Sequence, residues 1–205
     1  MIKVIGFDIG GVILNNCWSN KARESICIQF NVTIDKEKMG RHYFKLLDLL
    51  TVGKITEEQF FSNMITENNY NISKVKSHLR QQNYLQFPEV MQLLPKLRST
   101  YQIALMNNEG KEWNEYRIRK FKLRQYSHII LSSCDIKKMK PYKNYYQHCL
   151  KQLRIKPNEL LFVDNSKNNI ETAKELGIQT IHFKSPNQLK RELKKILKSP
   201  FLNRM

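Results

Sequence analysis

The stretch that decides the fold is residues 2–11, with the sequence IKVIGFDIGG. Its apolar run stops at an acid, which predicts a buried parallel strand with Asp8 at its carboxyl end. Gly10 and Gly11 follow directly, and glycines at such a point let the main chain approach a ligand closely. Open α/β sheets bind ligands at the carboxyl ends of their strands, so this segment indicates both a fold class and a place for a site.

The same pattern recurs later in the chain. Apolar runs at residues 103–106, 129–131 and 160–163 each stop at small polar or acidic residues, and residues 178–183 predict a last strand. Helical patterns fill the intervals between these runs. Strands that alternate with helices predict an α/β fold with a Rossmann-like, doubly wound parallel sheet.

Residues 17–85 interrupt this alternation. Their apolar positions recur at helical spacing without a convincing strand, and Thr56 with Gln59 has the spacing of a helix capping box. We therefore expect a helical cap domain at residues 17–85, inserted into a core domain made of residues 1–16 and 86–205.

Composition excludes several classes of protein. The chain has 205 residues, 41% of them hydrophobic, which is too many for a disordered protein. It lacks the run of about 20 apolar residues that a membrane span requires, so no membrane partner is expected. The four cysteines show neither CxxC nor zinc-like spacing, and no signal-peptide pattern precedes Asp8. These features favour reduced thiols in a cytoplasmic protein.

The net charge of +17 has two explanations. It could attract a nucleic acid, and two basic clusters, at residues 117–124 and 184–205, agree with that. It could also reflect a lysine-rich composition spread over the whole chain. The second explanation is favoured because no basic block is set apart as a tail or arm.

The polar residues at the strand ends suggest a chemistry. In a parallel sheet, Asp8, Asn107-Asn108 and Asp164-Asn165 would meet at one edge, with Lys140 in the connection after the 129–131 strand. Carboxylate and carbonyl oxygens suit a hard cation such as Mg²⁺. An ammonium group and amide donors suit a phosphoryl group, whose transfer depends mainly on positioning and charge stabilisation.

Four segments, in order, resemble the motifs of the haloacid dehalogenase superfamily. They are FDIGGV at residues 7–12, LMNNEG at residues 105–110, the pair Lys140-Pro141, and FVDN at residues 162–165 followed by Asn169. The resemblance covers residues 1–16 and about 86–183. It is best to the capped phosphatases, including those similar to α-D-glucose-1-phosphate phosphatase.

The resemblance implies a role for each matching residue. Asp8 and Lys140 would be catalytic, with Asp8 as the nucleophile that forms an aspartyl-phosphate. Substrate binding would fall to Ile9, Gly10, Asn107, Asn108 and Lys140. The Mg²⁺ cofactor would be held by Asp8, Gly10, Asp164 and Asn165. Asn169 would orient the site.

Three departures mark the site as degenerate. Gly10 stands where the family usually has a second aspartate, although phosphatases of the glucose-1-phosphate type also have glycine there. Asn107 replaces a serine or threonine, and Asn165 replaces an acid that usually binds the cation. A missing acid or base typically lowers the rate by about 10²–10⁴-fold.

Three hypotheses follow. The first is a Mg²⁺-dependent phosphohydrolase that acts on a small phosphorylated metabolite. The second is a catalytically impaired relative that binds a phosphorylated ligand or a protein without turnover. The third, motivated only by the positive charge, is a phosphatase or binder of nucleic-acid ends. The sequence leaves the substrate and the oligomeric state open.

Overall fold

The five strands form one parallel sheet in the computed structural model, which describes residues 1–16, 18–34, 40–65, 67 and 69–197. The spatial order is β3-β2-β1-β4-β5, with β1 in the centre. Ile5 of β1 is in register with Ile103 on one side and Leu161 on the other. The strands are β1 (Val4–Phe7), β2 (Gln102–Asn107), β3 (Ile129–Ser132), β4 (Leu160–Asp164) and β5 (Gln179–His182). Every strand expected from the sequence is present.

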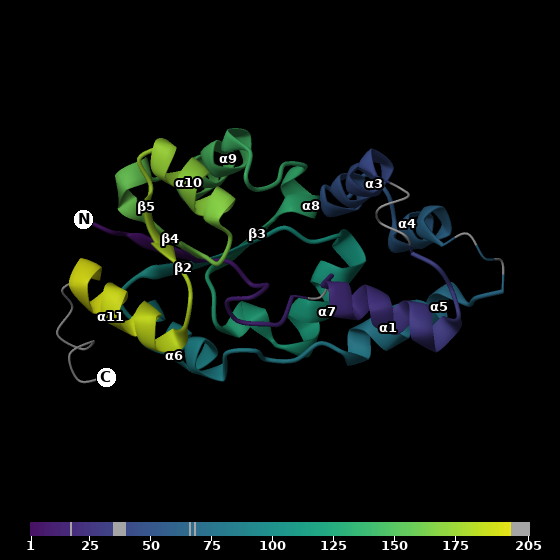
Figure 1. Cartoon of the computed structure of the whole chain (residues 1–205). Helices are drawn as coiled ribbons and strands as arrows, with labels where there is room; N and C mark the ends of the chain where they lie inside the picture. The colour runs from purple at the N-terminus through teal and green to yellow at the C-terminus, as the bar shows by residue number, and fades with distance from the viewer. Residues whose placement is uncertain (17, 35–39, 66, 68, 198–205) are drawn as a thin grey trace.

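Helices cover both faces of the sheet (Figure 1). On one face lie α6 (Pro88–Arg98), α7 (Lys111–Lys120) and α11 (Pro186–Leu197). The other face carries α9 (Lys143–Leu153) and α10 (Lys167–Glu175). The shorter helices are η1 (Leu123–Gln125), α8 (Ser133–Ile136) and η2 (Pro157–Glu159). The doubly wound α/β fold is therefore confirmed.

The alternation of side chains along β1 divides the core into two layers. Ile5 and Phe7 pack into the cluster that includes Leu94 of α6 and Leu193 of α11. Val4 points to the other face, into the cluster that includes Tyr145 of α9. Both layers are dry and apolar, which fixes β1 rigidly and with it the position of Asp8 at its end.

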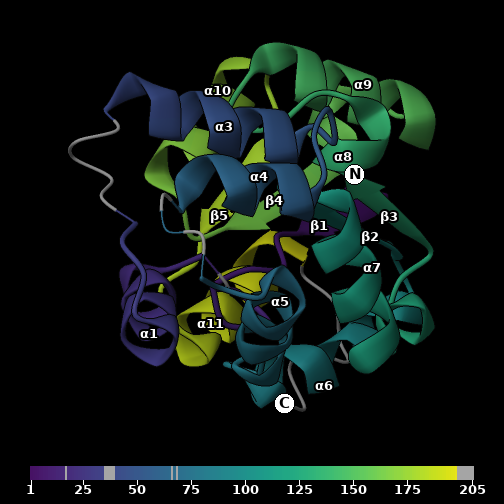
Figure 2. The ribbon, with the colours of Figure 1, turned by 90° about the vertical axis from the view of Figure 1, so that its right-hand side faces the viewer.

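The described residues between β1 and α6 include four helices, and we call residues 20–81 the helical insert. Its helices are α1 (Asn20–Phe30), α3 (Arg41–Thr51), α4 (Glu57–Met64) and α5 (Ile72–Gln81). The capping box at the start of α4 is confirmed: Thr56 Oγ1 accepts from the Gln59 N–H, and Gln59 Oε1 from the Thr56 N–H. Figure 2 shows the insert in front of the strand ends.

The two segments that connect the core to the insert, one before α1 and one after α5, lie side by side. Leu14 and Leu85 form an antiparallel bridge. Beside it, the side-chain amide of Asn15 bonds the main chain of both Gln82 and Tyr84, at 3.1 and 3.0 Å. The insert has its own hydrophobic cluster, which Trp113 of α7 joins. The boundary of a separate cap domain stays a prediction.

Several features of the composition have a place in the fold. Cys134 and Cys149 are buried free thiols and Cys27 is a half-buried one, while Cys17 lies outside the described residues. No helix within the described part of the chain is long and apolar enough to cross a bilayer. Arg117 is buried, so it contributes nothing to a basic surface at 117–124. The basic cluster at 184–205 lies partly outside the described residues.

Candidate active site

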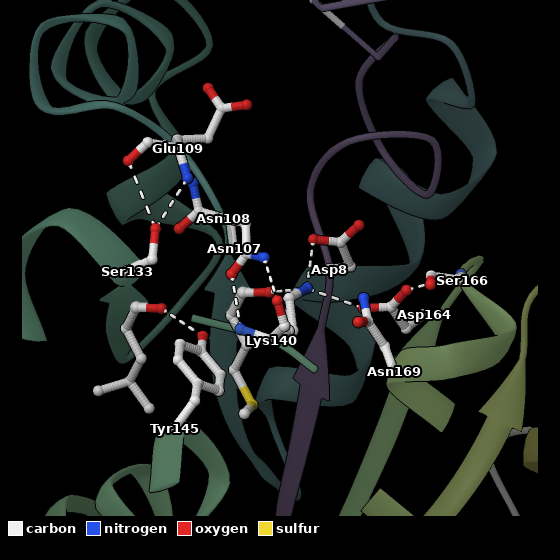
Figure 3. Close-up of polar contacts among 12 residues, drawn as sticks. Asp8, Asn107, Asn108, Glu109, Ser133, Lys140, Tyr145, Asp164, Ser166 and Asn169 are labelled. Carbon is white, nitrogen blue, oxygen red and sulfur yellow. Dashed lines mark hydrogen bonds and ion pairs between the residues drawn. The ribbon is translucent and has the colours of Figure 1, made fainter. Parts of the chain in front are cut away.

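Lys140 joins the two carboxylates that the sequence predicted to share a site (Figure 3). Its Nζ donates to Asp8 Oδ1 at 2.8 Å, to Asp164 Oδ2 at 2.8 Å and to the Met106 carbonyl at 2.7 Å. An ammonium group has three N–H bonds, so all of its donors are used. Lys140 is only 3% exposed, and its charge is therefore fixed between β1, β2 and β4.

Asp164 is held on both of its oxygens. Oδ1 accepts from the Ser166 main-chain N–H at 2.8 Å, and Oδ2 accepts from Asn169 Nδ2 at 3.0 Å in addition to Lys140. The side chain is fully buried. Asn169 thus holds Asp164, and Asp164 acts as a fixed counter-charge for Lys140; the role in orienting the site that the resemblance implies for Asn169 stays a prediction.

Burial changes the acidity of this cluster. It raises the pKa of the Asp8 carboxyl to about 7; the Lys140 ammonium opposes this shift, and the Asp164 carboxylate reinforces it. Burial alone would lower the pKa of Lys140, but the Asp164 and Asp8 carboxylates outweigh it, so this pKa lies above its usual value. Lys140 stays charged, and Asp8 is the group that titrates near neutral pH.

Asn107 and Asn108 have different surroundings although both follow β2. Asn108 holds the main chain of Lys140, donating to its carbonyl at 2.7 Å and accepting from its N–H at 3.0 Å. Asn107 is buried and donates to Asn114 Oδ1 at 2.9 Å. Its own Oδ1 has no hydrogen-bond donor within the part of the chain that the structure describes. Asn108 therefore positions Lys140, and Asn107 has hydrogen-bonding capacity to spare.

The glycines after Asp8 make room for Asn165. Gly11 has φ +78°, a conformation that strains any other residue, and a Cβ there would lie 2.3 Å from Asn165 Nδ2, so a side chain at this position would also displace Asn165. Ile9 is buried in the core and offers only its main chain to the site. The absence of a side chain at Gly11 therefore lets the loop after β1 lie close to Asn165 in the loop after β4.

A cavity of about 470 Å³, its open mouth included, collects these groups. Predicted residues that line it are Asp8, Gly10, Asn107, Asn108, Lys140, Asn165 and Asn169. Asp164 lies behind Lys140 instead of lining it. Asn16 and Glu109 also line the cavity, and neither was singled out by the sequence.

A buried ion pair stands beside the position where the family usually has its second aspartate. A Cβ on Gly10 would lie 3.9 Å from Arg117 Nη1. That nitrogen donates to Glu109 Oε1 at 3.0 Å, and Arg117 Nη2 donates to the Asn15 carbonyl at 2.6 Å. Sequence reasoning counted Arg117 among surface cations, because nothing in the spacing of a basic cluster distinguishes a buried arginine from its neighbours.

The donors around Asp8 fit a small hard cation, with one restriction. No group of three His, Cys, Asp or Glu side chains suited to a metal occurs among the described residues. Both Asp164 oxygens already accept hydrogen bonds. The available oxygens are those of the Asp8 carboxylate, the Gly10 carbonyl and the Asn165 amide. Mg²⁺ often binds proteins through one or two carboxylates and completes its shell with water and phosphate, so these oxygens are of the kind that it takes.

Comparison with known proteins agrees with the geometry. The sequence model described as haloacid dehalogenase-like hydrolase matches residues 5–183. D-ribitol-5-phosphate phosphatase of Bacteroides thetaiotaomicron is 24% identical over 207 residues, covering 97% of this chain and 100% of that protein. Bifunctional epoxide hydrolase 2 of Mus musculus is 23% identical over 137 residues, or 65% of this chain.

The matches to several curated relatives cover only a small part of them. The mouse epoxide hydrolase is covered over 25% of its length, and acyl-CoA dehydrogenase family member 10 of Mus musculus over 14%. Among solved structures, a HAD family enzyme from Bacteroides thetaiotaomicron, in complex with magnesium and inorganic phosphate, superposes with a TM-score of 0.73 at 23% identity. The superposition covers 90% of this chain and 96% of the chain of that enzyme. At 23% identity this similarity supports a shared fold only.

Proposed function

The chain belongs to the haloacid dehalogenase-like hydrolase family, and from this premise we propose that it cleaves a small phosphomonoester through an aspartyl-phosphate on Asp8. The observation that supports this most is the Lys140 ammonium, which joins Asp8 to Asp164 inside a polar cavity. The relative that acts on D-ribitol-5-phosphate supports a phosphomonoester as the substrate class. A cytoplasmic location stays a prediction.

The reaction has two steps on Asp8. In the first, a carboxylate oxygen of Asp8 attacks phosphorus, the bond between phosphorus and the leaving oxygen breaks with its electron pair on that oxygen, and that oxygen takes a proton from solvent water. In the second, water attacks phosphorus and gives a proton to the solvent, the bond between phosphorus and the Asp8 oxygen breaks, and inorganic phosphate and the Asp8 carboxylate are released. Lys140 keeps Asp8 in place and stabilises negative charge on the phosphoryl oxygens.

Asn107 supplies a further donor through a change of amide orientation. Exchanging the nitrogen and oxygen of both Asn107 and Asn114 is permitted, because the two atoms of an amide are assigned from the hydrogen-bond network. Asn107 Nδ2 then faces the phosphoryl group, and its oxygen accepts from Asn114. In the structure Asn114 Nδ2 donates to Cys134 Sγ at 3.8 Å; after the exchange the Asn114 oxygen would face this thiol instead. Burial raises the pKa of Cys134 to about 12, so the thiol keeps its proton.

The cofactor would bind at the mouth of this arrangement. The Asp8 carboxylate, the Gly10 carbonyl and the Asn165 amide would hold Mg²⁺. When bound, this ion supplies positive charge that lowers the cost of crowding phosphoryl oxygens against a carboxylate. The neutral amide of Asn165 weakens this set and supports the second hypothesis, in which a phosphorylated ligand binds without turnover.

The test is hydrolysis of phenyl phosphate, a generic phosphomonoester, with and without MgCl₂ by the parent and by Asp8→Asn. We expect Mg²⁺-dependent release of phosphate in the parent and a loss of about 10³-fold or more in the variant, since an amide is no nucleophile here. Asp48→Asn, an exposed change in α3, is the matched control and should retain the parent rate.

Two results would count against the proposal. Turnover that survives Asp8→Asn would exclude the aspartyl-phosphate. A parent that binds inorganic phosphate in a calorimetric titration but hydrolyses no phosphomonoester would establish the binding function in place of catalysis.

A further inference from the structure

Two neighbouring serines stand where β3 ends and α8 begins, and their hydroxyl groups have different surroundings. Ser132 and Ser133 are both fully buried. The Ser132 hydroxyl has no hydrogen-bond partner among the described residues. The Ser133 hydroxyl accepts from the main-chain N–H of Glu109 at 3.0 Å (Figure 3) and donates to the main-chain carbonyl of Thr51 at 2.7 Å. The Glu109 carbonyl lies farther away, at 3.5 Å, so the single hydroxyl proton goes to Thr51. Ser133 therefore links the segment after β2 to the helical insert.

The Thr51 carbonyl belongs to the end of α3, where a helix leaves its last carbonyls without main-chain donors. Two side chains of the core supply donors there: Ser133 donates to Thr51, and Lys137 Nζ donates to the Gly53 carbonyl at 3.1 Å. Gly53 has φ +65°, which strains any other residue, and a Cβ there would lie 3.0 Å from the Cys134 carbonyl. The end of α3 therefore rests closely on α8.

On the other side of Ser133, the Asn108–Glu109 segment leads to Lys140. The side chain of Asn108 holds the main chain of Lys140 through two hydrogen bonds, at 2.7 and 3.0 Å. Lys140 Nζ in turn contacts Asp8 and Asp164, each at 2.8 Å. A continuous set of contacts thus runs from α3 through Ser133 and the Asn108–Glu109 segment to the Lys140 ammonium.

The Asn108–Glu109 segment also lies between two cavities. Both of its residues line the cavity around Asp8 and a second, mainly apolar cavity under the insert, which measures about 490 Å³ with its open mouth. Thr51 lines the second cavity as well. Ser133 lines neither of them, so its hydroxyl group can affect turnover only through the residues that it holds.

We propose that Ser133 is a positioning residue, whose hydroxyl group fixes Asn108, and through it Lys140, while α3 rests on α8. The inference rests on the proposed function. One hydroxyl group holds both main-chain groups because it offers a donor and two acceptor positions. Without it, the Glu109 N–H loses this acceptor in a buried region, which favours a shift of the segment toward another partner. A shift of about 1 Å at the reacting groups can lower a rate by about 10²-fold.

The experiment measures kcat and KM for phenyl phosphate with MgCl₂ in the parent and in Ser133→Ala, which removes a single oxygen atom. We expect kcat to fall about 10- to 100-fold and KM to change about twofold or less, because the loss concerns the placement of reacting groups. Ser132→Ala is the matched control for the loss of a buried hydroxyl group, and Lys137→Met for the loss of a contact with the end of α3. Both controls should keep kcat within about twofold of the parent value.

A double-mutant cycle tests whether Ser133 acts through Asn108. In an Asn108→Ala background, Ser133→Ala should lower kcat by a further factor of about two at most, because two changes on one route are not additive. Effects that multiply in full would exclude this route and overturn the inference.

The single variants separate this inference from the proposed function. If the parent hydrolyses phenyl phosphate and Ser133→Ala keeps the parent kcat, the inference is wrong and the proposed function stands. An equal fall of kcat in Lys137→Met would mean that Ser133 only docks α3, which also overturns the inference. Absence of turnover in the parent overturns both.

Discussion

Around Asp8, all three N–H bonds of the Lys140 ammonium have acceptors, and both oxygens of Asp164 have donors. Beside the second cavity, under the insert, the Trp113 N–H and one Glu57 oxygen have no partner in the described part of the chain. Both regions are buried, so the difference does not come from solvent. The polar groups around Lys140 are therefore held by partners within the chain, whereas two polar atoms beside the second cavity have none among the described residues.

The largest expected effect is at Lys140, whose ammonium group joins the two carboxylates of the Asp8 region. Lys140→Met removes the only cation between Asp8 and Asp164, so two buried carboxylates are left without their counter-charge. We expect a loss of about 3–5 kcal/mol in the free energy of unfolding at pH 7, because an unpaired buried charge is costly. Urea titration measures it, with the exposed Lys174→Met in α10 as the control. A loss under about 1 kcal/mol would mean that the centre is not held together by this charge.

The next largest expected effect is the pH dependence of kcat/KM, which depends on the Asp8 region alone. Asp8 must be ionised to attack phosphorus, and burial raises its pKa to about 7. The value of kcat/KM should therefore fall about tenfold for each pH unit below 7, and level off above it. Lys140, whose pKa is raised above its usual value, stays protonated over this range and adds no second limb.

The profile is measured from pH 5 to pH 9 and corrected for the second ionisation of the substrate. Because the titrating group belongs to the Asp8 centre, phosphomonoesters with different leaving groups should give the same fall in kcat/KM below pH 7. A limb near pH 4 would show that Lys140 outweighs burial.

The smallest expected effect is at Asn165. Asn165→Asp places a carboxylate beside Gly11, where the neutral amide now packs. Mg²⁺ prefers charged oxygen ligands, so we expect its affinity for the ligand-free protein to rise about tenfold. Isothermal titration with MgCl₂ measures this, and Asn158→Asp, an exposed change in η2 at the other end of β4, adds the same charge elsewhere. Equal affinities in the two variants would place the cation away from Asn165.

The sheet and the meeting of Lys140 with Asp8 and Asp164 were predictable, because their signals are local or ordered along the chain. An apolar run that stops at Asp8 or Asp164 marks a strand end within a few residues. The pair Lys140-Pro141 gained its meaning only from its order among the other motifs. The capping box at Thr56 was predictable for the same reason, since a helix start depends on residues three apart.

The apolar cavity and the Arg117–Glu109 pair were not predictable in this way. Trp113 and Arg117 lie on one helix whose pattern suggested ordinary packing and surface charge. Their surroundings come from Trp18, Glu57 and Asn15, which are about 55 to 100 positions earlier in the chain. Such contacts depend on how the helical insert packs against the carboxyl ends of the strands. Periodicity in the sequence indicates which residues are buried, but not against which distant residues they pack.

The saturated ammonium of Lys140 has a consequence for turnover. An ammonium group whose three N–H groups all have acceptors keeps its position when another group enters the site. The phosphoryl group must therefore bind where this charge already lies. In the proposed reaction, little reorganisation would then accompany the passage to the transition state, which is the condition for strong electrostatic catalysis. Differences in rate between substrates would then arise from how the leaving group of each one binds. The arrangement of Asp8, Lys140 and Asp164 would be the same for all of them.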